Sequence, residues 1–584
     1  MEFGKLRINP LTNPAILDTG TWSPQAAWHI IDSLDTSYWR VVLQALVEGN
    51  TPPQHQDCRL YQPSQQPHQG MHSLLAEIHD GQHVFVTIGQ HDEQPLLGNA
   101  IGAKSLPDGS ELAAFAADAA VIDKFCRNIA PQKGPRALGP APRLGIGVRM
   151  STSVWPGIWT AMKKYDFAAN PIQNSLRELN MLEDVLAATR PNTNYLFSFG
   201  NIDEGHTGST FEGLWVSGVL SNLKDETTPR YGADADHIMV KRDPNGLGRA
   251  RRILDSARYY SFFTLDVSDI LNYEAVNERS AAKAEACLTQ TVQDSALVRE
   301  LMAYHREKSG FGGGRYSPDA AAVGRLVGKY WRALNATQDL YDHIVSLKQG
   351  VPFDLELSID ENPPEVRTCE SLTNDEELMF LLTEIRRRQL PITHIAPNFG
   401  VEKGRDYRCP GGLDELESRV RRQYQMASEQ GLMLDCHSGD DLTSATRRVF
   451  GRATNGNIHF KISPSLQVLF GQTLEDLYPD HFRFWWDDTY AYAEREAEGG
   501  AAVAIESLRE YKQGDDPKPS ARTSLFEHFN FATVGKRDAH GQFIFRERFY
   551  ELPEDFYEEY SRRVEQLLGE VAQDVFYAEE DVFL

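Results

Sequence analysis

The sequence predicts an α/β protein built on a parallel (β/α)8 barrel of the TIM type, and three observations lead to this prediction. Eight short apolar runs begin near residues 144, 194, 233, 261, 354, 393, 432 and 457. Stretches of helical character separate most of them, over about 25 to 50 residues, as one strand, one helix and two loops require. Polar side chains gather at the carboxyl ends of the runs, where barrels of this type form their active sites.

Three further regions surround or interrupt the barrel, which we place at 143–475. Residues 1–142 do not follow the strand–helix rhythm, and we expect them to form an N-terminal α+β appendage. The longest interval, about 270–350 after strand four, is rich in alanine and predicts a helical insertion on the rim. Residues 476–584 predict a helical C-terminal extension.

Composition and charge exclude several classes of protein. The chain has 584 residues and a formal net charge of −24, which opposes binding to a phosphate backbone. It contains no apolar stretch long enough to cross a membrane and no signal-peptide pattern. Six scattered cysteines without a CxxC pair argue against a disulfide framework and against a zinc knuckle. We expect a cytoplasmic protein without nucleic-acid or membrane partners, and a homo-oligomer is compatible with the sequence.

The parity of the strand residues places polar side chains inside the barrel, because residues i and i+2 of a strand share a face. The same-face polar sets are Asp435 and His437; His459, Lys461 and Ser463; Glu356, Ser358 and Asp360. The residues between them are apolar and suit the outer face, which packs under helices. The alternative, strands at a sheet edge with polar residues in water, suits these nearly apolar runs less well.

Histidines near the strand ends indicate a metal site. Inward charges and imidazoles are costly unless they are paired, hydrogen-bonded or bound to a metal. Imidazole is the commonest metal ligand, and a ring of histidines with carboxylates suits Zn²⁺, Mn²⁺, Ni²⁺ or Fe²⁺. We expect His237, His437 and His459 to bind the metal, while His394, at the start of its run, is a weaker candidate. The alternative for each is a hydrogen-bonded core histidine.

Four residues are candidates for moving protons. Asp266 ends the fourth run, and Glu402 and Lys403 follow the sixth. Lys461 points inward beside the expected metal, where a neighbouring cation would favour the neutral amine. For Glu402 and Lys403 the alternative is a solvated pair on a loop.

Four other residues are candidates for holding a substrate. Arg177 could bind a carboxylate through two parallel hydrogen bonds, or could be an ordinary arginine on a helix surface. Asn174 lies close to it in the chain, and Asn398 ends the sixth run. Asp440 follows His437 in a segment that starts a helix and offers backbone N–H groups to an anion.

Six stretches resemble the tagaturonate epimerase family: NPIQNSLREL (170–179), YGADADHIMVKRD (231–243), FFTLDVSD (262–269), HIAPNFGVEKGRDY (394–407), HSGDDLTS (437–444) and HFKIS (459–463). The resemblance covers roughly residues 145–475. It implies a metal-dependent isomerase that interconverts D-tagaturonate and D-fructuronate, or a related ketose, at the hydroxyl carbon β to the ketone. Its partner would be a small sugar acid or ketose.

The implied reaction favours retro-aldol cleavage, rotation of the aldehyde and re-addition, since a proton on a carbon β to a ketone is not acidic. A transient oxidation would need a nicotinamide, which we do not expect because no strand-linked GxGxxG occurs. In this hypothesis Asp266 or Glu402 is the base, and Lys461 or Lys403 stabilises the developing negative charge. The sugar acid would be oriented by Arg177, Asn174 and Asn398.

Two alternatives remain open at this point. The nearest is another metal-dependent barrel enzyme acting on sugars, such as an aldose–ketose isomerase or a class II-type aldolase. The other is a non-catalytic carbohydrate-binding protein on the same scaffold. A stoichiometric divalent ion whose removal abolishes activity would favour an enzyme.

Overall fold

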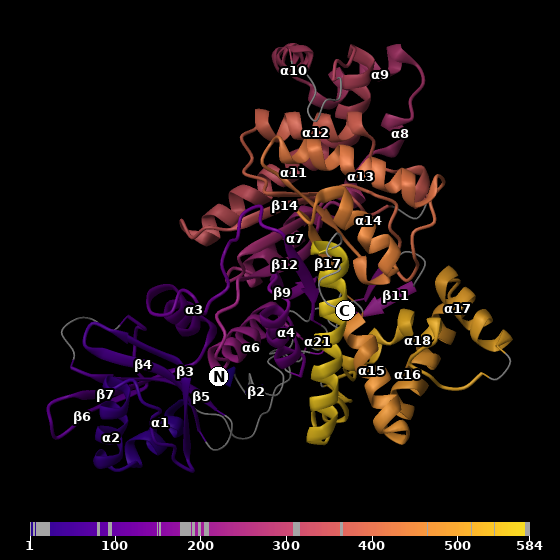
Figure 1. Cartoon of the computed structure of the whole chain (residues 1–584). Coiled ribbons are helices and arrows are strands. Elements are labelled where there is room, and N and C mark those ends of the chain that lie inside the picture. Colours follow the sequence, from indigo (N-terminus) through magenta and orange to yellow (C-terminus); the bar gives the residue numbers. More distant parts are fainter. Residues whose placement is uncertain are drawn as a thin grey trace.

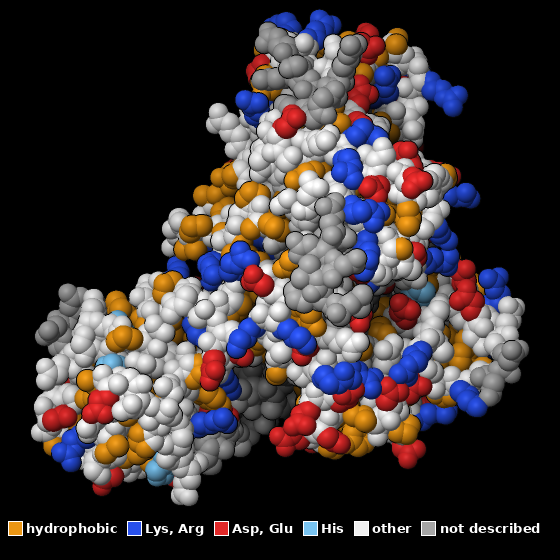
Figure 2. Space-filling view, in the orientation of Figure 1, with side chains coloured by type: hydrophobic (Ala, Val, Ile, Leu, Met, Phe, Trp, Pro, Cys, Tyr) orange, Lys and Arg blue, Asp and Glu red, His pale blue; other side chains and the backbone are white. Residues whose placement is uncertain are grey.

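The structure is a computed structural model of the whole chain (Figure 1). It describes residues 2–3, 6–7 and 24–577, apart from 79–81, 91–95, 149, 151–152, 176–188, 190–192, 197–199, 204–208, 308–315, 363–365, 464, 515–516 and 542. Among these residues, every helix is too short or too polar to traverse a lipid bilayer. On the face drawn in Figure 2, acidic and basic side chains are interspersed over the surface.

Eight parallel strands close into a barrel, which confirms the predicted fold class. In chain order they are β8 (Arg143–Gly147), β9 (Ala168–Ser175), β12 (Tyr231–Met239), β13 (Phe262–Asp266), β14 (Asp354–Ser358), β15 (His394–Ala396), β16 (Met433–Cys436) and β17 (His459–Ile462). Strand β17 pairs with β8 and closes the ring. All eight strands are buried along their length, as strands covered by helices must be.

A strand does lie near residue 194, but its predicted place in the barrel is wrong. Strands β10 (Thr193–Leu196) and β11 (Gly200–Asp203) pair antiparallel in a hairpin outside the barrel, and β9 is the second barrel strand. Its sequence, AANPIQNS, hides it because the buried side chains include Asn170, Gln173 and Asn174. Pro171 also lacks an N–H for the ladder, and the register of β9 shifts beside it against both neighbouring strands.

Helices cover the barrel between the strands. They are α4 (Trp155–Lys164), α6 (Phe211–Lys224), α7 (Gly246–Ser256), α12 (Asp375–Arg387), α13 (Gly412–Ser428), α14 (Ser444–Thr454) and α15 (Ser465–Leu477). The expected insertion between β13 and β14 consists of α8 (Tyr273–Val276), α9 (Ala281–Val292), α10 (Ser295–Glu307) and α11 (Ala320–Lys348). Short 3-10 turns η1 (Ser268–Ile270), η2 (Thr368–Glu370) and η3 (Gly439–Asp441) follow β13, β14 and β16 and shape the mouth of the barrel.

The appendage and the extension lie on opposite sides of the view in Figure 1. The appendage is an antiparallel sheet with α1 (Pro24–Ser33), α2 (Thr36–Val47) and α3 (Ala119–Asn128). Its strand order is β3-β4-β5-β7-β6, with bounds Cys58–His68, Met71–Ile78, His83–Gly89, Glu111–Ala116 and Gly102–Ser105. The extension contains α16 (Pro479–Glu498), α17 (Ala502–Gln513), α18 (Ser524–Phe529), α19 (Phe531–Val534), α20 (Arg546–Tyr550) and α21 (Glu554–Phe576). Helix α21 packs against α4, α14 and α15 and so joins the extension to the barrel.

A buried ion pair closes the amino end of the barrel. Arg143 begins β8 and Asp354 begins β14 across the ring, and Arg143 Nη1 lies 3.0 Å from Asp354 Oδ2. The carboxylate also accepts the backbone N–H groups of Leu138 and Gly139 at 2.9 and 3.0 Å. A paired and hydrogen-bonded charge of this kind is tolerated in a core. The carboxyl end of the barrel remains available for a functional site.

A disulfide joins Cys369 and Cys409, although the cysteine spacing argued against a disulfide framework. The two residues are 40 positions apart, and the loops that follow β14 and β15 bring them together at the mouth. The spacing of the two cysteines in the sequence could not predict this bond, because their proximity depends on the order of β14 and β15 in the barrel. The bond therefore links two loops that border the carboxyl end of the barrel.

We expect Cys369→Ser to lower the free energy of unfolding of the oxidised protein by about 2–4 kcal/mol, because the bond restricts the unfolded chain. Urea titrations with and without a thiol reductant would measure the change. Cys287→Ser, at a free and only half-buried cysteine, is the control. Identical unfolding curves for the oxidised protein and Cys369→Ser would contradict the prediction.

Candidate functional site

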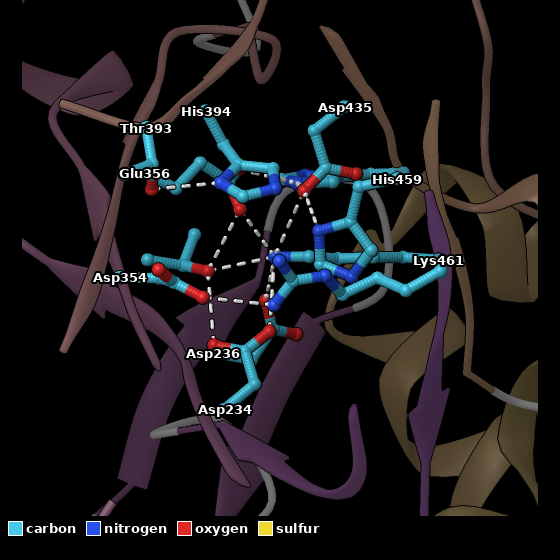
Figure 3. A network of polar contacts seen from close by, with 12 residues as sticks. Asp234, Asp236, Asp354, Glu356, Thr393, His394, Asp435, His459 and Lys461 are labelled. Atoms are coloured by element: carbon cyan, nitrogen blue, oxygen red, sulfur yellow. Dashed lines mark hydrogen bonds and ion pairs between the residues drawn. The ribbon is translucent and has the colours of Figure 1, made fainter. Parts of the chain in front are cut away.

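Lys461 of β17 lies at the centre of a ring of buried acidic side chains (Figure 3). Its ammonium is 2.7 Å from Glu356 Oε2 and 2.9 Å from Asp236 Oδ1. It is also 3.2 Å from Asp234 Oδ2 and donates to Thr264 Oγ1 at 2.7 Å. Burial alone would lower the pKa of Lys461, but the surrounding carboxylates raise it well above its usual value. Without a cation beside it, Lys461 is therefore an ammonium, and the neutral amine expected beside a bound metal stays a prediction.

A glycine on the neighbouring strand makes room for this lysine. A Cβ atom at Gly145 of β8 would lie 2.6 Å from Lys461 Cγ and 2.6 Å from Gln173 Oε1. The amide of Gln173 in turn donates to Asp236 Oδ2 at 3.0 Å. Glycine is thus required at this position for the lysine and the amide to enter the barrel together.

Two imidazoles lie above the lysine, nearer the mouth. The ring centroids of His237 and His437 are 4.9 Å apart in an edge-to-face arrangement. His437 Nδ1 lies 3.0 Å from Asp360 Oδ2, and its Nε2 lies 2.8 Å from Glu356 Oε1. His237 Nδ1 lies 3.1 Å from Asp266 Oδ2. Each imidazole is thus oriented by carboxylates that come from other parts of the barrel.

The backbone beside both imidazoles is unusual. His237 has φ +48°, and the register between β12 and β13 shifts between Ala235 and Ile238. Ser438, which follows His437, has φ +54°. A residue other than glycine in the left-handed region costs about 1–2 kcal/mol, and such strain clusters at functional sites. These two positions support the carboxyl end of the barrel as the functional site.

A second pair of imidazoles lies deeper in the barrel. His459 Nδ1 is 2.7 Å from Asp435 Oδ2, and the ring of His394 is 5.4 Å from that of His459. The ring of Phe262 contacts both, at 4.8 Å from His394 and 5.1 Å from His459. Burial lowers the pKa of both imidazoles well below its usual value. Both are therefore neutral.

The structure does not bring the three predicted ligands into one group. Among the residues it describes, the groups with ligand atoms within 4.8 Å of one another are His237, Asp266 and Glu361, and Glu356, Asp435 and His459. The reason is the register, because Asp435 pairs with His459. His437, two residues further along β16, is therefore about 6–7 Å closer to the mouth than His459. It lies between the two groups, in contact with His237 and Glu356.

The charges at this end of the barrel fit a divalent cation. Seven carboxylates line it: Asp234, Asp236, Asp266, Glu356, Asp360, Glu361 and Asp435. Even if Lys461, His237 and His437 are all positively charged, four carboxylates lack a counter-charge. Burial raises the pKa of Asp234 to about 7 and raises that of Asp435 well above its usual value. Oδ1 of Asp435 and Nε2 of His459 are buried without hydrogen-bond partners, as ligand atoms for a cation would be.

Three of the predicted proton-moving and substrate-binding residues hold the site together. Asp266 Oδ1 accepts the N–H of Ser268 at 3.0 Å, so both its oxygens are engaged. Asn398 Nδ2 donates to the backbone oxygen of Ser371 at 3.0 Å, and its Oδ1 accepts the N–H of Gly400 at 2.9 Å. Asp440 Oδ2 accepts the N–H groups at the start of α15, those of residues 463 and 465, each at 3.0 Å.

Of the remaining predicted residues, Glu402 and Lys403 lie in the loop that follows β15, and Asn174 lies on β9. Glu402 pairs with Arg408, whose Nη2 is 2.6 Å from its Oε2, and Lys403 beside it is exposed. Asn174 is buried on β9, and its Nδ2 has no hydrogen-bond partner. Arg177 lies outside the described residues. The substrate roles of these residues stay predictions.

Residues that the prediction did not name as site residues form the centre of the ring. They are Asp234, Asp236, Thr264, Glu356 and Asp435, whereas Glu361, also not predicted, lies beside His237 and Asp266. Most of these residues could have been found from the alternation of inward and outward side chains that placed Lys461 and His437 inside the barrel. Asp234 and Asp236 share a face, and so do Asp435 and His437.

Comparison with known proteins points to one family. A model of the UxaE tagaturonate epimerase family matches residues 203–572. A curated tagaturonate/fructuronate epimerase from Thermotoga maritima is 26% identical over 330 residues, 56% of this chain and 62% of the relative. The matched part thus spans less than two thirds of that relative.

Solved structures share the fold. The native and a glycerol-complexed crystal structure of fructuronate-tagaturonate epimerase UxaE from Cohnella laeviribosi each align with a TM-score of 0.62 and 19% identity. The alignments cover 92% and 93% of this chain and 99% of each solved chain. The barrel and its surrounding regions are therefore an architecture already observed by crystallography.

Proposed function

The chain belongs to the tagaturonate epimerase family, and from this premise we propose that it interconverts D-tagaturonate and D-fructuronate. The observation that carries the proposal is the ring of carboxylates around Lys461 with His237 and His437 above it, at the carboxyl end of the barrel. Such a site can hold a polar substrate, move a proton and stabilise negative charge.

The two sugar acids differ at the hydroxyl carbon β to the ketone, so inversion must break a bond at that carbon. In a retro-aldol step the β-hydroxyl loses its proton and becomes an aldehyde as the bond between the α and β carbons breaks. The electron pair of that bond passes to the ketone half, which becomes an enediolate. Rotation of the aldehyde and re-formation of the same bond, with the proton returned to oxygen, give the epimer.

Proton movement at the mouth has a suitable pair of residues. The Asp360 carboxylate pairs with His437, and its pKa is lowered by His437 although burial opposes this. It is therefore ionised and can accept the hydroxyl proton, with His437 as a relay. Glu402 is the second candidate base. Lys461 provides the fixed positive charge below the substrate that negative charge on the enediolate requires.

A divalent cation would polarise the ketone and stabilise the enediolate, and His237, Asp266 and Glu361 would hold it. We favour this group over the deeper one because His237 is 8% exposed at the mouth, whereas His459 is fully buried. Glu356, Asp435 and His459 would then support the ring from below.

The experiment is incubation of the purified protein with D-tagaturonate in D₂O, with added Mn²⁺, Zn²⁺ or Ni²⁺, followed by NMR. We expect D-fructuronate to form and the same equilibrium to be reached from either sugar. The inverted carbon should keep its hydrogen, because the retro-aldol route never breaks that C–H bond. Deuterium at this carbon would reject the retro-aldol route, and absence of turnover with every metal would reject the function.

A further inference from the structure

The loop that follows β15 begins at the carboxyl end of the barrel and carries Glu402 and Lys403. Its far end is fixed to the loop after β14 by the disulfide at Cys409. Asp406 fixes it to α14, because its Oδ1 accepts the backbone N–H of Thr443 at 3.0 Å and the hydroxyl of Thr446 at 2.8 Å. These contacts come from the barrel itself.

The centre of the loop is held by the C-terminal extension. Arg405 Nη2 lies 2.6 Å from Glu506 Oε2 on α17. The ring of His528 on α18 packs on Gly404, where a Cβ would lie 2.0 Å from His528 Nε2. Gly404 also has φ +71°, so a side chain at this position is opposed by the backbone and by the imidazole alike. The imidazole is in turn 3.1 Å from Ser507 Oγ through its Nδ1.

The hydrogen bonds of Asp406 to Thr443 and Thr446 place the loop beside η3, the turn that follows His437. Burial raises the pKa of Asp441 in η3 well above its usual value, and Asp440 raises it further. The backbone N–H of Gly404 and the positive charge of Lys403 act in the opposite direction. Lys403 lies three residues before Asp406 in the same loop, and its side chain is exposed.

A positively charged side chain at the mouth would favour the binding of a sugar acid. The ring below it carries more carboxylates than positive groups, and a sugar acid brings a further negative charge. A positive side chain that reaches the mouth would reduce this repulsion. Lys403 has this effect only if the loop is held in place. On a loose loop, the entropy cost of ordering the loop and the side chain would offset the favourable charge interaction.

We propose that Glu506 and His528 of the C-terminal extension are positioning residues, which hold the β15 loop so that Lys403 faces the carboxylate of the bound sugar acid. The proposal rests on the proposed function for the identity of that acid. It gives α17 and α18 a role in catalysis although neither helix belongs to the barrel.

The test reverses the ion pair. We expect Glu506→Arg and Arg405→Glu each to raise KM for D-tagaturonate about tenfold with a smaller change in kcat, and the double variant to recover most of the loss. Lys403→Met should raise KM by at least as much, and Glu506→Arg combined with it should add little. The control is Glu494→Arg, which breaks an exposed ion pair with Lys512 in the same extension.

A loss that the double variant does not recover, or an equal loss in Glu494→Arg, would overturn the proposal. Hydrogen exchange of residues 400–408 provides a readout without turnover, and it should become faster in Glu506→Arg and His528→Ala. Unchanged exchange would also overturn the proposal. If the protein epimerises neither sugar but exchange rises as expected, the proposed function fails while the anchoring of the loop stands.

Discussion

Replacement of Lys461 by Met is expected to lower kcat for the epimerisation by at least about 10³-fold. The ammonium is the central positive charge of a ring in which Asp234, Asp236 and Glu356 lie within 3.2 Å of it. Without it these carboxylates repel one another, and part of them must take up protons. Removal of one partner from a buried ion pair also destabilises a protein by about 3–5 kcal/mol. Product NMR and urea unfolding would measure the two effects.

Lys329→Met separates the loss of stability from the loss of chemistry. Lys329 is equally buried and lies 2.5 Å from Glu377 Oε1, between α11 and α12 and away from the ring. We expect this variant to lose stability by a similar amount and to keep its kcat at temperatures where it is folded. If Lys461→Met kept full turnover, or if both variants lost turnover equally, Lys461 would have no special place in the reaction.

The sequence was sufficient for the inner and outer faces of most barrel strands. Alternation along β16 and β17 placed Asp435, His437, His459 and Lys461 inside the barrel. The sequence of a single strand is enough to show which of its residues share a face. It failed for β9, whose inward residues are amides and whose Pro171 resembles a strand breaker. The hairpin at 193–203 had the apolar character that β9 lacked. Burial of polar residues in a functional barrel therefore weakens the pattern by which its strands are recognised.

Relations between strands could not be predicted in the same way. That His437 and His459 lie in different layers depends on the pairing of Asp435 with His459, which is a property of the closed barrel. The charge of Lys461 depends on carboxylates from three other strands. Each of these residues can be read from the sequence, but the raised pKa of Lys461 depends on their proximity in the folded barrel. The encounter of Cys369 and Cys409 has the same origin.

Removal of the His237 imidazole is the decisive test of the metal site. We expect His237→Ala to reduce bound divalent metal from about one ion per chain to less than about a tenth, and kcat by at least about 10³-fold. The fold should be retained, because His237 lies at the mouth of the barrel and outside its apolar core. Inductively coupled plasma analysis after dialysis, with circular dichroism as the test of folding, would measure the result.

His459→Ala is the matched variant, because the two groups of ligands share no residue. If the ion is held by His237, Asp266 and Glu361, His459→Ala keeps it and loses stability through the uncompensated Asp435. If His459→Ala loses the ion and His237→Ala keeps it, the deeper group is the metal site. Access of the ion to that group then requires Lys461 to move. His343→Ala, which changes a half-buried imidazole paired with Asp255 outside the barrel, should leave metal content unchanged. Retention of the ion in both barrel variants would contradict a metal site built on either group, and the excess of carboxylates would then have to be balanced by bound protons.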